Sequence, residues 1–366
     1  MILPYLIRLY HKNSRYLRVL PLAEQVRLAS WGRRWFMKRL VNQNPGTEYR
    51  PDKEWERTLW GIKFRTPLGN AAGMFKNGEG YANMAALGAG AFIGGTSTAN
   101  PRQGNTKNGI YLPFISLPQS KIALNFLGLP NYGDALLSAK PVTLSKVEGC
   151  PIGWSVMRSP DFNETDGLDQ LIKSLWLYHN HTQIDFIEIN ESCPNIQVSS
   201  ANMVERLSRI AQEFLQKRKR HLPVVIKLSN DISHSSLHGL VHDLVRLGFD
   251  GLNLGNTSTA YSSYRPQITA SEMELFDFFS ANFAGGISGY VLKKRSLELC
   301  AVAAEVLAKI KPVHEFNLIR CGGIDQLQDI LDGERNGVDL SQWYSGFFTR
   351  YMESGSMVYR DLFLGH

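Results

Sequence analysis

Eight short β-rich runs alternate with helical segments from residue 55 onwards, and this alternation constrains the fold more than any other feature. The runs cover residues 67–73, 91–97, 151–156, 186–192, 224–228, 251–257, 318–324 and 341–347. Helical patterns, such as those over residues 202–219 and 237–247, separate most of them, and several runs end in Gly, Asn, Ser or Cys. The pattern predicts an α/β fold: one eight-stranded parallel (β/α) barrel, with the active site at the carboxyl ends of the strands.

The main alternative is an open doubly wound sheet, which would place a G-x-G-x-x-G turn after its first strand. No such turn follows residues 67–73. A chain of 366 residues with 43% hydrophobic and 20% charged residues can bury a large core, which excludes a disordered or fibrous protein. We therefore assign residues 55–366 to one catalytic barrel domain.

Positive charge is concentrated in an extension that precedes the barrel. Residues 1–40 contain nine Lys and Arg against one acid, whereas the rest of the chain sums to −1. A basic end on a near-neutral body argues against a nucleic-acid-binding protein. Two amphipathic helical patterns occupy residues 1–45, and Trp31, Trp35 and Phe36 lie in the second. This extension either lies on an anionic membrane surface or packs as a basic hairpin on the barrel.

The sequence also bears on the location of the protein. It contains no run of about 18 apolar residues, so it predicts no membrane-spanning helix. Four cysteines, scattered without a C-x-x-C pair or a secretory signal, indicate a reducing compartment. We expect a peripheral protein on the cytoplasmic face of a membrane, with the cytoplasm as the alternative.

Residues 189–195, Ile-Asn-Glu-Ser-Cys-Pro-Asn, carry the most distinctive chemistry. Asn190 and Asn195 flank Cys193, and Pro194 restricts the backbone at the end of a predicted strand. Carboxamides can hold a planar ligand there, while a thiol, with an ordinary pKa of about 8.5, can remove a proton from carbon. The alternative is a structural cysteine buried beside turn-forming asparagines.

Other strand ends carry polar side chains that would meet at the same end of a barrel. Lys76 follows the small residues that end the first run, and Asn256 and Thr257 close the sixth. Asn125 lies shortly before a Gly-Leu-Pro-Asn segment, although an asparagine by itself is typical of a turn. Lys227 lies within an apolar run, where an unpaired ammonium is costly, so we expect it to face negative charge inside the barrel.

Glycine-rich segments near the last two runs indicate a phosphate site. Cys321-Gly322-Gly323 and Tyr344-Ser345-Gly346 stand where such barrels bind phosphate through backbone N–H groups, and residues 285–289 precede a predicted helix. No His, Cys, Asp or Glu cluster has metal-ligand spacing, so we predict no metal site. Neither a P-loop nor a G-x-S-x-G motif is present.

Over essentially all of residues 55–350, these segments resemble the dihydroorotate dehydrogenases, FMN-dependent barrels of pyrimidine synthesis. The matching motifs are Pro67-Leu68-Gly69-Asn70-Ala71-Ala72-Gly73 with Lys76, Pro101-Arg102-Gln103-Gly104-Asn105, Asn125 with Gly128-Leu129-Pro130-Asn131, Asn190 with Ser192-Cys193-Pro194-Asn195, Lys227, Asn256-Thr257, Gly285-Gly286-Ile287-Ser288-Gly289, Cys321-Gly322-Gly323 and Tyr344-Ser345-Gly346. The resemblance implies oxidation of dihydroorotate to orotate in de novo UMP biosynthesis, with FMN as the cofactor.

The same resemblance implies a role for each matching residue. Cys193 would remove the C5 proton of dihydroorotate while hydride passes from C6 to N5 of the flavin, and Lys227 would stabilise the negative charge of the reduced flavin. The residues implied to bind dihydroorotate are Lys76, Asn125, Leu127, Gly128, Leu129, Asn190, Asn195, Asn256 and Thr257. Those implied to bind FMN are Ala72, Gly73, Lys76, Thr96, Ser155, Asn190, Lys227, Gly255, Ser288, Gly289, Gly322, Gly323, Tyr344 and Ser345.

The resemblance leaves the electron acceptor open. The helical extension resembles that of the membrane-associated, quinone-reducing class, whereas Cys193 and residues 128–131 resemble the soluble class. Ser116 stands where the membrane class often has an arginine along its quinone tunnel. We expect a quinone acceptor. The alternatives are a soluble acceptor such as fumarate, another dihydropyrimidine as substrate, and a non-catalytic binding protein that docks on membranes.

Overall fold

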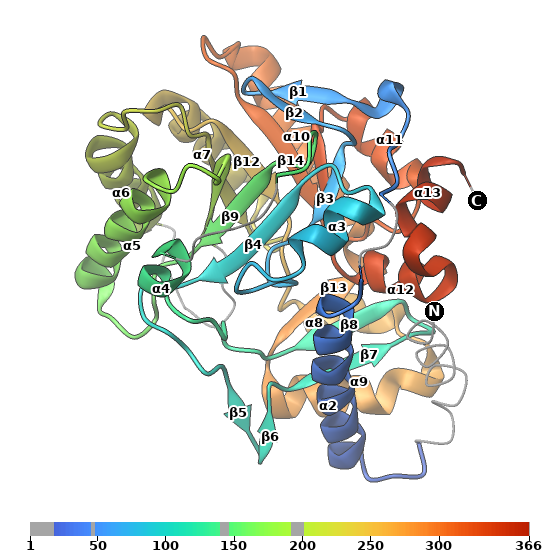
Figure 1. The fold of residues 1–366 in the computed structure, drawn as a ribbon. Coiled ribbons are helices and arrows are strands. Elements are labelled where there is room, and N and C mark those ends of the chain that lie inside the picture. The colour runs from blue at the N-terminus through green and yellow to red at the C-terminus, as the bar shows by residue number, and fades with distance from the viewer. Residues whose placement is uncertain (1–17, 45–47, 140–145, 192–200, 366) are drawn as a thin grey trace.

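The structure is a computed structural model that describes residues 18–44, 48–139, 146–191 and 201–365 (Figure 1). Eight parallel strands form the central sheet in the order β3-β15-β14-β12-β11-β10-β9-β4. Their bounds are β3 Leu68–Asn70, β4 Phe92–Ser97, β9 Ile152–Val156, β10 Phe186–Asn190, β11 Val224–Leu228, β12 Gly251–Leu254, β14 Asn317–Cys321 and β15 Leu340–Trp343. A parallel bridge between Gly69 and Ala91 joins β3 to the residue before β4, the two ends of this order, and so closes the barrel. The eight predicted strands and the barrel are therefore confirmed, although the eighth strand ends at Trp343 and residues 345–347 are helical.

Helices surround the barrel, and the two helical patterns named from the sequence are among them. The helices are α3 Tyr81–Leu87, α4 Asp134–Ala139, α5 Glu164–His179, α6 Ala201–Ile210, α7 His234–Leu247, α8 Tyr261–Tyr264, α9 Met273–Phe283, α10 Lys293–Ile310, α11 Leu327–Arg335, α12 Ser345–Ser354 and α13 Val358–Phe363. Local signals set the ends of α7: the Ser233 hydroxyl accepts the N–H of Ser236 at 3.1 Å, and Gly248 ends the helix with a φ of 83°.

The interior of the barrel is apolar at the amino-terminal ends of the strands. This layer consists of Ile93, Phe186, Val225, Ile319 and Leu340. A hairpin of β1 Arg57–Leu59 and β2 Ile62–Phe64 covers it, and Trp60 in its turn donates an indole hydrogen bond to the carbonyl of Asp250 at 2.9 Å. Because strand side chains alternate, inward-facing positions two residues further on form the next layer, which contains Glu188, Lys227 and Gln342.

A small antiparallel sheet adds to the carboxyl end of the barrel. It contains β7 Phe114–Leu117, β8 Ile122–Asn125 and β13 Gly286–Gly289, in the order β13-β8-β7, while β5 Thr106–Lys107 and β6 Ile110–Tyr111 form a separate hairpin. The sequence did not predict these strands. Residues 285–289, expected only as a glycine segment before a helix, contain the whole of β13, which pairs with β8 before α10 begins.

Helix α2, Leu22–Val41, confirms the second helical pattern of the extension, while the first pattern lies outside the described residues. α2 packs beside β7, where the Ser30 hydroxyl accepts the N–H of Phe114 at 2.9 Å and Val26 is buried. Trp31 on the same helix is 58% exposed. Packing on the body is thus observed for α2, and membrane contact stays a prediction. Over the residues described, no helix is long and apolar enough to cross a bilayer.

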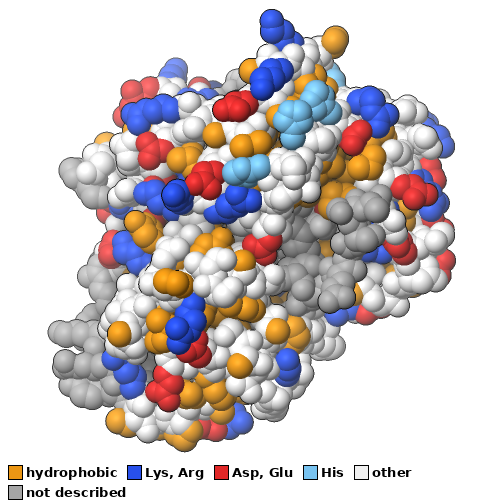
Figure 2. All heavy atoms as spheres, turned by 180° about the vertical axis from the view of Figure 1, so that it is seen from behind, with side chains coloured by type: hydrophobic (Ala, Val, Ile, Leu, Met, Phe, Trp, Pro, Cys, Tyr) orange, Lys and Arg blue, Asp and Glu red, His pale blue; other side chains and the backbone are white. Residues whose placement is uncertain are grey.

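The rear surface of the molecule carries both signs of charge. Figure 2 shows acidic and basic side chains interspersed over this face, with hydrophobic side chains between them. Such a surface agrees with the near-neutral charge that the sequence predicts for the body of the protein.

Candidate active site

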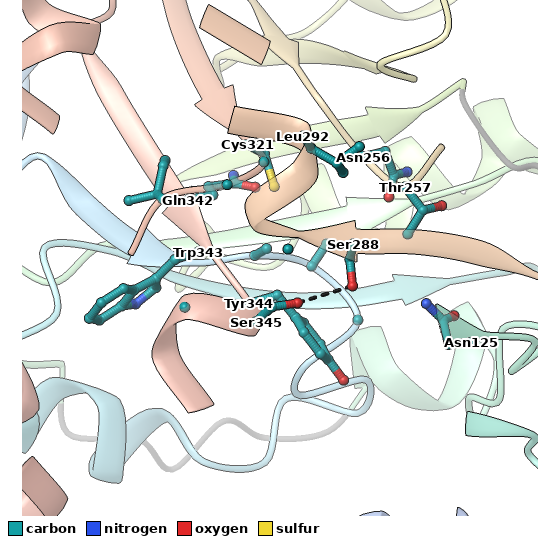
Figure 3. Close-up of a pocket in the computed structure, with 18 of the residues that line it drawn as sticks. Asn125, Asn256, Thr257, Ser288, Leu292, Cys321, Gln342, Trp343, Tyr344 and Ser345 are labelled. Carbon is teal, nitrogen blue, oxygen red and sulfur yellow. Dashed lines mark hydrogen bonds between the residues drawn. The ribbon is translucent and has the colours of Figure 1, made fainter. Parts of the chain in front are cut away.

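A cavity lies at the carboxyl ends of the barrel strands, and both sheets contribute to it (Figure 3). Figure 3 shows Asn125 of β8, Ser288 of β13 and the loop residues Asn256 and Thr257 around one space. The predicted site residues that line it are Ala72, Gly73, Lys76, Thr96, Asn125, Leu127, Gly128, Leu129, Asn190, Lys227, Asn256, Thr257, Ser288, Gly289, Gly322, Gly323, Tyr344 and Ser345. The fold therefore brings these residues together at the end of the barrel where the sequence predicted a site.

Four predicted site residues are not among the lining residues. Cys193 and Asn195 lie outside the described part of the chain. Ser155 is buried one layer behind, with its hydroxyl 2.9 Å from that of Thr96. A Cβ at Gly255 would lie 1.4 Å from the carbonyl oxygen of Cys321, so this glycine lets the end of β12 approach β14 closely. The catalytic role of Cys193 and the binding roles of the other three stay predictions.

Amide side chains form a connected row along the cavity. Asn256 Nδ2 donates to Asn190 Oδ1 at 3.3 Å, and Asn190 Nδ2 donates to the Thr96 hydroxyl at 3.3 Å. Asn125 Nδ2 donates to the carbonyl of Gly286 at 3.4 Å within the small sheet, and Asn125 lines the same cavity. An amide offers two N–H donors and a carbonyl with two lone pairs. One side chain can therefore serve both this row and the polar edge of a flat heterocycle.

The loop that carries Asn256 and Thr257 is held through its backbone. Asn230 Nδ2 donates to the carbonyl of Asn256 at 2.7 Å, and the Ser229 hydroxyl donates to the carbonyl of Thr257 at 3.2 Å. Both supporting residues follow β11, the neighbouring strand. Our sequence analysis missed them because they act on the main chain of a different loop, which leaves no pattern in the sequence.

Lys76 comes from the loop after β3, close to Gly73. Gly73 has a φ of 89°, and a Cβ built there would meet only the Nζ of Lys76, at 3.7 Å, within 4 Å. An L-residue rarely adopts such a φ, so glycine both permits the turn and leaves open space beside the lysine. The ammonium and the asparagine row thus line the same cavity.

Lys227 lies at the floor of the cavity and is 2% exposed. Its Nζ is 2.9 Å from Oε1 of Gln342 and 3.3 Å from Oε1 of Glu188. Burial lowers the pKa of Lys227, but the Glu188 carboxylate and, to a smaller extent, Cys321 together outweigh it, and the pKa is raised overall. The negative charge that Lys227 was expected to face inside the barrel is therefore the carboxylate of Glu188.

Sequence reasoning missed Glu188 and Gln342 as parts of the site, although a signal for Glu188 exists. It stands within the apolar run Phe-Ile-Glu-Ile-Asn, two residues before Asn190, and so faces the same side of the strand. The argument that Lys227 needs a charged partner applies equally to this carboxylate. Gln342 has no comparable signal, because a neutral amide in a strand is not unusual.

The far end of the cavity is rich in backbone donors. Gly322 and Gly323 follow β14 with φ values of 128° and 75°, which only glycine adopts without strain. Ser345 begins α12, whose first-turn N–H groups have no partner within the helix. The hydroxyl of Ser345 is 3.0 Å from that of Ser288, an interaction drawn in Figure 3. Such an end suits an anion.

The described cysteines are poor candidates for a base. Burial raises the pKa of Cys150 and Cys300 to about 12. Burial also raises the pKa of Cys321, which lines the cavity, while Lys227 lowers it by less. A thiol with a raised pKa stays protonated at neutral pH and cannot accept a proton from a substrate. Cys193 is therefore the remaining cysteine for that role.

A second, mostly apolar cavity of about 290 Å³ adjoins the first and lies between α2, the small sheet and α12. Its lining residues are Ala29, Trp31, Gly32, Arg33, Trp35, Phe36, Phe114, Ser116, Pro118, Lys121, Ile122, Ala123, Tyr344, Ser345, Phe348, Thr349 and Met352. Tyr344 and Ser345 line both cavities. Arg33 donates to the Tyr344 hydroxyl at 2.7 Å and lies over the Phe114 ring, so α2 supplies a guanidinium to the cavity that Ser116 also lines.

Comparison with known proteins agrees with this architecture. The chain is 29% identical over 298 residues to a dihydroorotate dehydrogenase (quinone) of Acinetobacter baylyi, covering 79% of this chain and 82% of that protein. It is 27% identical over 313 residues to the protein of the same name from Aliivibrio salmonicida, covering 83% and 84% of the two chains.

Two crystal structures of DHODH from Eimeria tenella share the fold. The ferulenol complex has a TM-score of 0.71 at 20% identity and covers 92% of this chain and 89% of that one. The ligand-free form has a TM-score of 0.72 at 20% identity and covers 92% of both chains. The sequence model of the family described as "Dihydroorotate dehydrogenase" matches residues 55–362. The chain therefore belongs to the dihydroorotate dehydrogenase family.

Proposed function

We propose that this protein is an FMN-dependent enzyme that oxidises dihydroorotate to orotate in pyrimidine biosynthesis and passes the electrons to a quinone. The observation that carries this proposal is the single cavity that joins an amide row and a lysine to a donor-rich, glycine-lined end. Family membership and relatives named as quinone-dependent dihydroorotate dehydrogenases support it.

The cavity residues fit FMN. A flavin needs space for a flat ring, and its phosphate needs several N–H donors. The open space at Gly73 and the amide of Gln342 suit the ring, and Gly322, Gly323 and Ser345 suit the phosphate. Lys227, which lines the same cavity, would offset with its positive charge the negative charge that reduction brings to the flavin.

Dihydroorotate combines ring amides with a carboxylate, and the other end of the cavity has partners for both. Asn125, Asn190 and Asn256 would bind the amide edge, and the Lys76 ammonium would pair with the carboxylate. A dihydropyrimidine without a carboxylate would not make this charge pair with Lys76. This difference favours dihydroorotate over dihydrouracil.

The oxidation removes a hydride from C6 and a proton from C5 of dihydroorotate. FMN, when bound, accepts the hydride at N5. The proton needs a base, and we assign it to Cys193, whose thiolate is the basic form. Asn190, at the end of β10 and three residues before Cys193, would fix the ring so that C5 faces this segment.

The second cavity suits a quinone, because an apolar lining binds an apolar ring and tail. Trp35 and Phe36 from α2 and Phe348 from α12 supply aromatic side chains to this lining, and Tyr344 lines both this cavity and the proposed flavin site. Peripheral attachment to a membrane surface through residues 1–45 would place its mouth close to a lipid-soluble acceptor. The exposed Trp31 and the basic side chains of α2 support this placement.

Cofactor release and acceptor turnover test this function. Heat-denatured protein is expected to release FMN, and anaerobic oxidation of dihydroorotate is expected to proceed with a short-chain ubiquinone but not with fumarate. Turnover with fumarate but not with the ubiquinone would show that the electron acceptor is a soluble molecule. A colourless protein that takes up no FMN would refute the proposal.

A further inference from the structure

The floor of the proposed flavin site rests on a buried polar cluster formed by Glu188, Lys227, Asn253 and Gln342. Lys227 and Gln342 line the cavity, whereas Glu188 and Asn253 are fully buried beside them and do not line it. Oε2 of Glu188 accepts from Asn253 Nδ2 at 2.7 Å and from Gln342 Nε2 at 2.9 Å. Asn253 Nδ2 also donates to Gln342 Oε1 at 2.9 Å. The four side chains therefore form one connected network.

This network sets the orientation of Gln342. Its Nε2 donates to Glu188, so its Oε1 faces the Lys227 ammonium. A flipped amide would place an N–H group against the ammonium and an oxygen against the carboxylate, and both contacts would be unfavourable. Glu188 thus holds Lys227 in two ways, directly by charge and indirectly through the Gln342 carbonyl.

The charges of Glu188 and Lys227 depend on each other. Burying either charge without the other would cost a large desolvation free energy, and a buried lysine without a counter-charge releases its proton. Among the described residues, neither side chain takes part in another ion pair. The other titratable group that acts on Lys227 is the thiol of Cys321 on β14, whose own pKa is raised by burial, so it stays uncharged at neutral pH.

We propose that Glu188 is a positioning residue, which keeps Lys227 protonated and fixes its ammonium in the proposed flavin site. This inference rests on the proposed flavin site. Because the positive charge is present before reduction, the ammonium meets the developing negative charge without first taking up a proton. The carboxylate itself touches neither substrate nor cofactor and acts through Lys227 and Gln342.

The first test is a pH titration of the visible spectrum of the oxidised, flavin-loaded protein from about pH 6 to about pH 9. A charge gained or lost beside the ring shifts the flavin bands. The wild type is expected to show no transition, because Lys227 stays charged. E188Q keeps the size of the side chain but loses its charge, so burial then lowers the pKa of Lys227 and a one-proton transition is expected.

The matched control for this titration is D250N. Asp250 is also a buried barrel carboxylate, paired with Arg218 at 2.9 Å, but neither residue lines the cavity. Its spectrum is expected to be as flat as that of the wild type. A flat titration of E188Q with flavin bound would overturn the proposal, as would a transition of equal size in D250N.

A second measurement, thermal unfolding of the apoprotein, needs no flavin. K227Q leaves Glu188 buried without a counter-charge, whereas K227Q/E188Q removes both charges. The double variant is expected to unfold at the higher temperature, because the second substitution removes the penalty created by the first. A double variant no more stable than K227Q would overturn the proposal. A protein that takes up no flavin yet shows this rescue would refute the function instead.

Discussion

Gly32 offers a way to fill the second cavity without moving the backbone. It lies within α2 and lines this cavity but not the first, and a Cβ built there would meet no atom within 4 Å. A larger side chain at this position therefore projects into open space. If the cavity binds the quinone, the phenyl ring of G32F fills part of the space that the quinone would occupy. Binding of dihydroorotate and FMN in the first cavity is expected to stay unchanged.

The size of the effect follows from the apolar contact that is lost. Each methylene-sized group displaced from an apolar site costs about 0.8 kcal/mol. Displacement of two or three such groups costs about 2 kcal/mol, which corresponds to a roughly 30-fold rise in the KM for a short-chain ubiquinone. G32A adds one methyl group and removes the helix cost of glycine, about 1 kcal/mol, so it should raise stability and leave the quinone KM near that of the wild type.

Three measurements separate the outcomes for Gly32: steady-state quinone kinetics, anaerobic flavin reduction by dihydroorotate, and thermal unfolding. G239F is the matched control, because Gly239 also lies within a helix, α7, has no atom within 4 Å of its Cβ position, and lines neither cavity. Wild-type quinone kinetics in G32F would refute the placement of the acceptor in this cavity.

Three further substitutions test the proton acceptor and the electrostatics of the fold. C193A should bind FMN and orotate but reduce the flavin roughly 10²–10⁴-fold more slowly in anaerobic stopped-flow measurements; a wild-type rate would show that the proton leaves by another route. C193S should retain partial activity with its pH profile displaced upward, because a hydroxyl is harder to deprotonate than a thiol. Burial raises the pKa of Asp339 to about 6, so the folded state binds its proton more tightly than the unfolded chain does. The free energy of unfolding should therefore fall as the pH rises from about 4 to about 6. D339N, which can still accept the N–H of Leu318, should remove up to about 3 kcal/mol of this fall in the free energy of unfolding. Urea unfolding in which D339N loses as much stability between these pH values as the wild type would contradict this.

The barrel could be predicted because its strands are buried on both faces and so appear as apolar runs with polar ends. The small sheet could not, because strands such as Gly286–Gly289 are short and glycine-rich and gain their structure from pairing with β8. The same limit applies to Arg33 and Tyr344, which meet across 311 positions of sequence. That contact depends on how α2 docks, which no local pattern encodes.

Within the site, side chains at strand ends were predictable and their supports were not. Asn190 and Lys227 stand out by type and position in the sequence, whereas Gln342 gains its role only from where the fold places its amide. Glu188 lies between these cases, since a lone carboxylate in an apolar strand is as unusual as a lone lysine. Residues 192–200, which include Cys193, lie outside the described residues, so the assignment of the base stays a prediction.

The central claim is that one cavity brings dihydroorotate and flavin together for electron transfer. An anaerobic titration of the oxidised, flavin-loaded protein with dihydroorotate tests it most directly, with dihydrouracil as the comparison. Dihydroorotate is expected to bleach the visible flavin band with one equivalent per flavin, while dihydrouracil, which lacks the carboxylate for Lys76, is expected to leave the band unchanged. Bleaching by dihydrouracil and not by dihydroorotate would refute dihydroorotate as the substrate.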